Sequence, residues 1–492
     1  MTVEQFEKEQ KKLLQDPEIG NAWLEYQSQY PYVSAFYRGA EQYENQISVV
    51  NGKKAGTDIN LYKLFTEQCY NLLCPGGHCG IVIPSGIYSD LGTKQLREML
   101  FEHTEVTGLF SFENRKEIFE GVHRSFKFVV LTFEKGETTE EFPAAFMRHD
   151  VEELTRFPQT GSLPMSVELI HSLAPDSLSV IEFKSEADVR ITDKMLRFPL
   201  LGAKIEGTWN LSLTREFDMT NDSKLFKTMP GPDRIPLYEG KMIHQFREGF
   251  TKPRYWAEEK DARAALLSSR MRRVKRVASE AGLSDEAIEA DSELDYNCYR
   301  SAHRAIGRST DERAMIATIL PPGVVCGNSL HVSERFVDVA RGGAIVPRLL
   351  INNAELLFLL ALLDSFVVDY NLRLRIAANL SMFYVYQLPI PRLRSGDRYF
   401  GEIVERVAKL VCTTPAFDDL AREVGLGSHT QGVTNDVQRA RLRAELDGII
   451  ARLYDLTEDE FAHILTTFPL VPEPTKVAAR NAYRDVERGL IA

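Results

Sequence analysis

The pattern between residues 60 and 133 constrains the fold most, because helical and extended stretches alternate there at the lengths found in α/β domains. Two stretches repeat apolar residues at helical spacing, and between them stands a short continuous apolar run typical of a strand buried in a parallel sheet. Two β-rich runs follow. The predicted elements are a helix at Leu61–Leu73, a strand at Gly80–Pro84, a helix at Lys94–His103, and strands at Val106–Phe112 and Ser125–Phe133. This order predicts one half of a doubly wound α/β domain.

Three stretches of this region carry a family resemblance. They read GTDINLYKLF (56–65), PGGHCGIVIPSGI (75–87) and FENRKEIFEGVHRSFKFVVLTF (112–133). They resemble the downstream half of adenine-specific N6 DNA methylases, in particular the fused methylase–endonucleases of type IIG restriction–modification systems and the related phage-exclusion methylases. The resemblance covers most of the chain, from about residue 56 to about residue 470. It implies part of a site-specific DNA methyltransferase acting in restriction–modification or phage defence.

The resemblance also implies a fold class and an order of domains. The fold is α/β: the C-terminal half of a Rossmann-like methyltransferase sheet, built as helix, strand, helix and hairpin, with a last strand antiparallel to the others. An α+β target-recognition domain and a C-terminal helical segment follow. The expected parts are a helical lead-in over 1–55, the partial methyltransferase domain over 56–160, the recognition domain over 161–395 and the helical segment over 396–492.

Length and composition set broad limits. At 492 residues the chain exceeds one ordinary core, so two or three domains are expected. A hydrophobic content of 44% and a charged content of 26% are those of a globular protein. The net charge of −11 argues against a general polyanion binder, although a local basic face can still bind DNA. Six cysteines without a secretory leader indicate a reduced, cytoplasmic protein.

Two methyltransferase motifs are missing from the sequence. No strand–GxG–helix unit, in which glycine lets the backbone approach S-adenosylmethionine closely, precedes residue 60. The Asn/Asp-Pro-Pro-aromatic motif, which accepts hydrogen bonds from the target amino group, is absent too, since the pair Pro321-Pro322 has neither flank. We therefore expect no complete catalytic set here, with S-adenosylmethionine bound mainly by a missing N-terminal half. Either an upstream methyltransferase polypeptide supplies that half, or the frame is truncated, or the chemistry is lost.

The resemblance implies site residues near the end of the predicted sheet. Phe119 matches the aromatic residue that stacks on the flipped adenine in such methylases; the alternative is a core phenylalanine that caps a loop. Pro84 and Ser85 follow the predicted buried strand, at the carboxyl edge where ligands bind in open α/β folds.

Arginines four residues apart predict a DNA-contacting face farther along the chain. Arg300, Arg304 and Arg308 would lie in a row on one helix, where guanidinium groups can hold phosphates and reach guanine edges. The alternative is a structural row paired with Asp311 and Glu312. The residues expected to contact double-stranded DNA are Lys241, Arg300, Arg304, Arg308, Arg313, Arg373 and Arg375.

A second basic stretch has two interpretations. Residues 260–276 contain seven Lys and Arg, and seven acids follow from Glu280 to Asp295. The basic run either pairs with the acidic run or binds phosphates.

Metal and membrane binding are not expected. The spacing of Cys69, Cys74 and Cys79 fits no CxxC pair, so these residues are interpreted as small buried hydrophobes. The apolar run Leu356–Val368 is shorter than the ~20 residues that a bilayer span needs, which predicts a core helix.

Two hypotheses follow. In the first, the chain is the target-recognition half of a DNA adenine methyltransferase and acts together with an upstream polypeptide. In the second, it is a non-catalytic DNA-binding or assembly protein derived from such a methylase.

Overall fold

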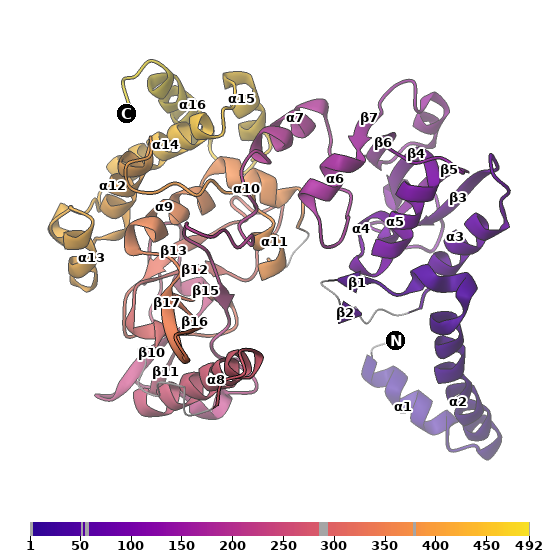
Figure 1. The fold of residues 1–492 in the computed structure, drawn as a ribbon, viewed down its shortest axis with the longest axis horizontal. Helices are drawn as coiled ribbons and strands as arrows, with labels where there is room; N and C mark the ends of the chain where they lie inside the picture. The colour runs from indigo at the N-terminus through magenta and orange to yellow at the C-terminus, as the bar shows by residue number, and fades with distance from the viewer. Residues whose placement is uncertain (1–2, 51–52, 55–58, 285–293, 377–379, 492) are drawn as a thin grey trace. The chain divides into compact units, whose positions relative to one another are not determined.

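The computed structural model of the protein describes residues 3–50, 53–54, 59–284, 294–376 and 380–491. The chain divides into two compact units, residues 1–186 (unit 1) and residues 187–492 (unit 2), as Figure 1 shows by colour along the chain. The mixed α/β class predicted from the sequence is confirmed. In the described ranges, no helix is both long enough and apolar enough to cross a bilayer.

Unit 1 begins with the polar helical lead-in that the sequence predicts. Helix α1 spans Val3–Leu13 and helix α2 spans Pro17–Gly39. Asp16 caps α2, because its side chain accepts hydrogen bonds from the backbone N–H groups of Glu18 and Ile19, at 2.9 and 3.4 Å. None of the residues of α2 is buried, which agrees with the abundance of polar residues in this stretch.

A five-stranded sheet forms the body of unit 1. Its elements and their neighbours are β1 (Val49–Val50), β2 (Lys53–Lys54), α3 (Leu61–Leu72), β3 (His78–Pro84), α4 (Gly86–Ser89), α5 (Lys94–His103), β4 (Thr104–Glu113), β5 (Lys127–Lys135), β6 (Glu141–Arg148), β7 (Leu163–Ser166) and α6 (Val167–Leu173). The strand order is β3-β5-β4-β6-β7. Strand β5 runs antiparallel to both β3 and β4, as predicted for the last strand of the segment, and β6 runs parallel to β4.

The prediction that Gly80–Pro84 is buried inside a parallel sheet is wrong for the described chain. Among the described strands, β3 lies at the edge of the sheet and pairs only with β5, in the antiparallel direction. Val82, in the middle of the strand, is 53% exposed. A continuous apolar run predicts burial but does not reveal how many neighbours the strand has, and within the described residues only one side of β3 is covered.

Within the residues that the structure describes, unit 2 contains two four-stranded sheets, a separate two-stranded ribbon and a helical layer. The elements are α7 (Glu186–Met195), β8 (Leu213–Thr214), β9 (Phe226–Lys227), β10 (Arg234–Tyr238), β11 (Tyr255–Glu258), α8 (Glu259–Glu280), β12 (Arg300–Arg304), β13 (Ala317–Leu320), β14 (Val325–Cys326), β15 (Leu330–Ser333), β16 (Phe336–Arg341), β17 (Ala344–Leu349), α9 (Asn353–Leu363), α10 (Phe366–Arg373), α11 (Met382–Tyr386), α12 (Phe400–Val411), α13 (Asp418–Glu423), α14 (Asp436–Leu453), α15 (Glu458–Thr466) and α16 (Glu473–Glu487). The sheets are ordered β14-β10-β11-β9 and β13-β12-β15-β8, and the ribbon is β16-β17.

The largest core of unit 2 surrounds α9 and α10. The predicted core helix is thus confirmed as buried, but it is two helices, because α9 ends at Leu363 and Ser365 caps α10 by accepting a hydrogen bond from the N–H of Val368 at 3.2 Å. The helix start predicted at Thr457 is also confirmed, since Thr457 and Glu460 form a capping box. The four-part division of the chain into 1–55, 56–160, 161–395 and 396–492 stays a prediction.

Candidate functional site

The carboxyl ends of β3 and β4 lie at the same end of the sheet of unit 1, on either side of the start of β5. Phe128, near the start of β5, pairs with Pro84 on β3 and with Phe112 on β4. Because directly paired residues on neighbouring strands project from the same face of a sheet, these three side chains form one row. The turn after β3 and the loop after β4 therefore leave the sheet side by side.

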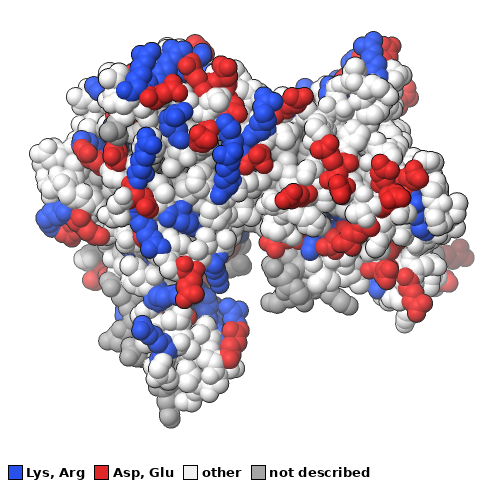
Figure 2. Space-filling model, turned by 45° about the horizontal axis from the view of Figure 1, so that its top comes forward, with Lys and Arg blue, Asp and Glu red and all other residues white. Residues whose placement is uncertain are grey.

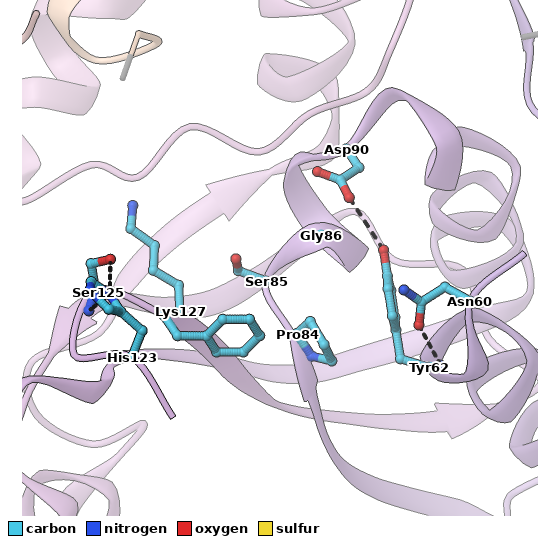
Figure 3. Close-up of a pocket in the computed structure, with 10 residues that line it drawn as sticks. Asn60, Tyr62, Pro84, Ser85, Gly86, Asp90, His123, Ser125 and Lys127 are labelled. Atoms are coloured by element: carbon cyan, nitrogen blue, oxygen red, sulfur yellow. Dashed lines mark hydrogen bonds between the residues drawn. The ribbon is translucent and has the colours of Figure 1, made fainter. Parts of the chain in front are cut away.

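A pocket of about 510 Å³ opens at this edge (Figure 3). Its walls come from the start of α3, from the turn after β3 and from the loop that leads into β5. Pro84 and Ser85, which the sequence places at the carboxyl edge, both line it. In Figure 3, Tyr62 and Asp90 lie on one side of Ser85, and His123 and Lys127 lie on the other.

Tyr62 and Asp90 shape one wall of the pocket. The Tyr62 hydroxyl donates a hydrogen bond to Asp90 Oδ2 at 3.4 Å. Burial, with the carboxylate of Asp90, raises the pKa of Tyr62 well above its ordinary value, so the phenol stays protonated as a donor. Gly86 packs closely beside this pair, because a Cβ at that position would overlap Asp90 Oδ2 and the Tyr62 hydroxyl unless these side chains shifted.

Arg97 on α5 holds the turn that carries these residues. Its guanidinium is buried and donates to the carbonyls of Ile87, Asp90 and Ser177 at 2.6 to 2.7 Å. It also donates to Thr93 Oγ1 at 2.5 Å. Burial lowers the pKa of Arg97 to about 9, which still leaves it charged at neutral pH. The wall of the pocket after β3 is therefore rigidly anchored to the core.

The opposite wall holds a cation and a histidine. Lys127 Nζ donates to both carboxylate oxygens of Glu182, at 3.0 and 2.7 Å, and Glu182 also accepts from the Tyr88 hydroxyl at 2.9 Å. His123 Nδ1 lies 2.8 Å from Ser125 Oγ and accepts the Ser125 N–H at 3.2 Å. Because Nδ1 is thus an acceptor, the proton of neutral His123 is on Nε2.

Phe119 lies on the loop after β4 and is held there by a buried amide. Asn114 Nδ2 donates to the carbonyls of Phe119 and Val122, at 3.0 and 2.9 Å, and Asn114 Oδ1 accepts the Phe119 N–H at 2.9 Å. The Phe119 ring meets the Phe128 ring edge-on, with centroids 4.8 Å apart, yet Phe119 remains 45% exposed. The loop therefore fixes one edge of the ring against the sheet and leaves the rest accessible.

The structure brings Phe119 to the same end of the sheet as Pro84 and Ser85, although the aromatic residues that line the pocket itself are Tyr62 and Phe126. Sequence reasoning missed Asn114, Tyr62 and Asp90. Of these three, only Asn114 could have been proposed from its sequence context, since it stands at the start of a glycine-containing loop, where a side-chain amide can bond to the loop backbone.

The predicted arginine row does not lie on a helix. Arg300 and Arg304 delimit strand β12, the central strand between β13 and β15. Arg300 is fully buried, where it pairs with Glu216 and donates to the carbonyl of Val324 at 2.6 Å. Arg304 donates to the carbonyl of Ile243 at 2.6 Å. Pairing with two neighbouring strands overrides the local spacing of four.

The other predicted DNA contacts are divided between buried and exposed positions. Arg313 is buried, with Nε donating to Asp369 Oδ2 at 2.7 Å. Arg373 donates to backbone carbonyls that include Ser309 at 3.0 Å. Burial lowers the pKa of Arg375 to about 10. Lys241 and Arg308 are exposed, and Lys241 Nζ forms an ion pair with Glu239 Oε2 at 3.3 Å.

The residues just described can be tested for their fit to a metal ion and to S-adenosylmethionine. Among the residues that the structure describes, no three His, Cys, Asp or Glu side chains form a possible metal cluster. The pocket turn also does not fit S-adenosylmethionine by itself, because the space above Gly86 is filled by Asp90 and Tyr62 and is not a cradle for a ligand.

Comparisons with known proteins bear on the same segment. Residues 31–119 match the family described as Eco57I restriction-modification methylase. No curated protein matches the chain. Among solved structures, the chain is similar to the type IIL restriction-modification enzyme MmeI in complex with DNA, with 11% identity over 84% of this chain and 52% of that chain and a TM-score of 0.41.

The chain is also similar to the type IIG restriction endonuclease BpuSI, with 15% identity over 82% of this chain and 51% of that chain and a TM-score of 0.30. It spans about half the length of these two proteins. Through residues 31–119, which run from within α2 to Phe119, the chain is related to the restriction-modification methylases.

Proposed function

We propose that the chain is the downstream part of an S-adenosylmethionine-dependent, site-specific N6-adenine DNA methyltransferase of a restriction–modification system. Unit 1 contributes the trailing strands of the catalytic sheet, and unit 2 recognises the DNA target. A further polypeptide segment supplies most of the cofactor site and the Asn/Asp-Pro-Pro-aromatic motif. The observation that carries this proposal is the position of Phe119, which is presented half-exposed at a sheet edge beside a pocket, within the family-matched segment.

Phe119 would receive the target base. An enzyme that modifies a base within a duplex must flip it out, and an accessible aromatic ring offers a stacking surface. Asn114 acts as a positioning residue, because its hydrogen bonds hold the backbone on both sides of Phe119. S-adenosylmethionine would supply the methyl group when bound: its S–CH3 bond would break, adenine N6 would take the methyl group and lose a proton, and S-adenosylhomocysteine would be the leaving product. Acceptors for that amino group come from the further segment.

The free edge of β3 supports the need for that segment. Within the described residues, β3 has no strand on its outer side. The neighbouring helix α3 exposes three large apolar side chains, Leu61 (69%), Phe65 (59%) and Leu72 (76%). A strand edge and an apolar helix face beside each other are what a sheet presents where further strands and a covering element pack. We propose that the cofactor-binding half packs there.

Reconstitution tests the proposed function. The chain is co-expressed with a polypeptide that carries a glycine-rich turn and the Asn/Asp-Pro-Pro-aromatic motif, encoded directly upstream. Transfer of a tritiated methyl group to duplex DNA is measured, and the product base is identified after hydrolysis. We expect N6-methyladenine only when both polypeptides are present. If the reconstituted pair bound DNA but transferred no methyl group, the proposed methyltransferase function would be overturned. That result would favour the alternative of a non-catalytic DNA-binding protein.

Two phenylalanines provide a matched pair of variants. Base stacking on an aromatic side chain is worth ~1–3 kcal/mol, so Phe119→Ala is expected to reduce transfer about tenfold or more. Phe126→Ala removes a similarly exposed ring, 44% against 45%, from the same loop and is expected to have the smaller effect. A larger loss from Phe126→Ala would assign the stacking role to the pocket residue.

A further inference from the structure

The β16–β17 ribbon of unit 2 has one face packed and one face free. Asp338 on β16 accepts hydrogen bonds from Arg270 on α8, at 2.5 and 3.1 Å. Ile345 on β17 is buried against Val274 and Ala278 of the same helix. Asp338 pairs with Pro347, and Ile345 pairs with Ala340, which lies two residues beyond Asp338 on β16. Asp338 and Ile345 therefore project from the same face of the ribbon, and that face packs against α8.

The register places two arginines on the opposite face. Arg348 pairs with Val337, and Arg341 pairs with Ala344. These pairs alternate with those that contain Asp338 and Ile345, so both arginines project away from α8. Both side chains are exposed, and within the described chain neither has a hydrogen bond or an ion pair. The partly buried Val339–Val346 pair lies between them.

Glycines make the ribbon end in open space. Gly342 and Gly343 form the two-residue turn, with φ of 61° and 83°. Positive φ at both central positions matches the turn that follows the natural twist of a hairpin. A Cβ at either glycine would meet no atom within 4 Å, so the tip projects from the surrounding structure.

Within the described chain, exposed cations without an ion-pair partner include Arg272 and Arg276 on α8 as well as Arg341 and Arg348, so the last two are singled out by their place on the open face of the ribbon. Lys and Arg lie interspersed with Asp and Glu on the face shown in Figure 2, so exposed charge alone does not identify a DNA surface. Unit 2 contains 42 Lys and Arg and 42 Asp and Glu, whereas unit 1 contains 17 and 28. Where both signs balance, cations that carboxylates leave unneutralised are the ones available to phosphates.

We infer that the β16–β17 ribbon enters the major groove of duplex DNA and contacts it through Arg341 and Arg348. The major groove, ~12 Å wide, admits a two-stranded ribbon. Arg341 lies four residues further along β16 than Val337, the partner of Arg348, which places the two arginines ~13 Å apart along the ribbon. This inference rests on the proposed function, because it specifies how unit 2 would contact the DNA.

Binding of labelled duplex DNA to the full chain, measured by fluorescence anisotropy at several salt concentrations, tests the inference. The double variant Arg341→Ala/Arg348→Ala is expected to weaken binding about tenfold or more per arginine. If both arginines contact phosphates, the slope of log affinity against log salt falls by about 2. If they contact guanines, the slope is unchanged and discrimination between DNA sequences falls. Either result supports the ribbon.

Arg272→Ala/Arg276→Ala is the matched control. Arg272 and Arg276 are exposed on α8, and helical geometry places them on the side opposite Arg270 and Val274 and hence away from the ribbon. This variant is expected to bind within about twofold of wild type. An equal loss in the control would mean a general charge effect and would overturn the inference.

Two further outcomes separate this inference from the proposed function. If the Arg341→Ala/Arg348→Ala variant bound DNA with wild-type affinity, the proposed contact between the ribbon and DNA would be overturned, and the proposed function would stand. A wild-type chain that binds no duplex DNA at low salt would overturn both. An RNA duplex of the same sequence is expected to show no ribbon-dependent binding, because its major groove is too narrow for the ribbon.

Discussion

Asn114 encloses the backbone of Phe119 from both sides, with its amide nitrogen 3.0 Å from the Phe119 carbonyl oxygen and its amide oxygen 2.9 Å from the Phe119 nitrogen. The asparagine is buried and the phenylalanine is half-exposed, so a core residue determines where a surface ring lies. Glu117 and Gly121, with φ of 52° and 75°, complete the loop between β4 and β5.

Asn114→Ala is expected to lower the free energy of unfolding of unit 1 by ~1–3 kcal/mol, because three hydrogen bonds made by one buried amide are lost together. Urea unfolding measures the change. Asn71→Ala is the control, since Asn71 is exposed and its side chain makes a single hydrogen bond, to the Gln42 carbonyl. Equal destabilisation by the two variants would contradict a special role for Asn114.

Gly86→Ala is expected to destabilise unit 1 by ~1–3 kcal/mol and to break the Tyr62–Asp90 hydrogen bond, because the added methyl group overlaps both partners. Thermal unfolding and a tyrosine absorbance titration measure the two effects. Gly39→Ala, where a Cβ would meet nothing within 4 Å, is expected to be neutral or slightly stabilising. A stable Gly86→Ala variant would show that the wall of the pocket can move.

Stability is expected to fall in mild acid because of a buried histidine pair in unit 2. His331 Nδ1 lies 3.2 Å from His303 Nε2, and Arg215 Nε donates to His331 Nε2 at 3.0 Å. Burial lowers the pKa of His303 to about 3 and that of His331, which also faces Arg215, to about 4. Only the unfolded state then binds protons just below pH 6.5, so stability is lost as the pH falls from there.

At pH 5 the loss is expected to reach ~2 kcal/mol per histidine relative to pH 7 or above. Urea unfolding of wild type and of His303→Gln/His331→Gln at both pH values measures it. Burial raises the pKa of Asp364 to about 8, so between pH 8 and pH 4 protonation of Asp364 stabilises the folded state as the pH falls, opposite to the effect of the histidines. Asp364 is present in both proteins, so the comparison with the variant cancels its contribution. The same pH dependence in both proteins would contradict the prediction.

Charges on the apolar face of α3 are expected to abolish assembly with the cofactor-binding segment. Phe65→Glu and Leu72→Glu change exposed side chains, so the free energy of unfolding should change by less than ~0.5 kcal/mol. Co-purification with the tagged partner measures the loss. Leu470→Glu, equally exposed but in unit 2, is the control. Normal assembly of the α3 variants would place the interface elsewhere.

Local signals predicted the elements of unit 1 well. Helix α5 matches its predicted range, because its apolar repeat and its ends lie within the segment itself. The neighbours of β3 and the position of β12 could not be read in this way, since pairing partners are distant in the sequence. The spacing of Arg300 and Arg304 is equally compatible with a helix or a strand.

The candidate site shows the same division. Pro84 and Ser85 were placed at the sheet edge from the end of a predicted strand, and both line the pocket. The free arginines were missed, because only the contacts of Asp338 and Ile345 with α8 show which face of the ribbon is open. Burial of Arg300 and Arg313 in ion pairs depends on Glu216 and Asp369, which are more than fifty residues away.

Within the described residues, the outer side of β3 has no partner strand, and this affects the solubility of the isolated protein. A row of backbone donors and acceptors without partners is a template on which a second copy can add its own β3. Purified alone, the protein should therefore lose solubility as its concentration rises. Addition of the proposed cofactor-binding segment is expected to restore solubility, which can be measured by light scattering without any assay of catalysis.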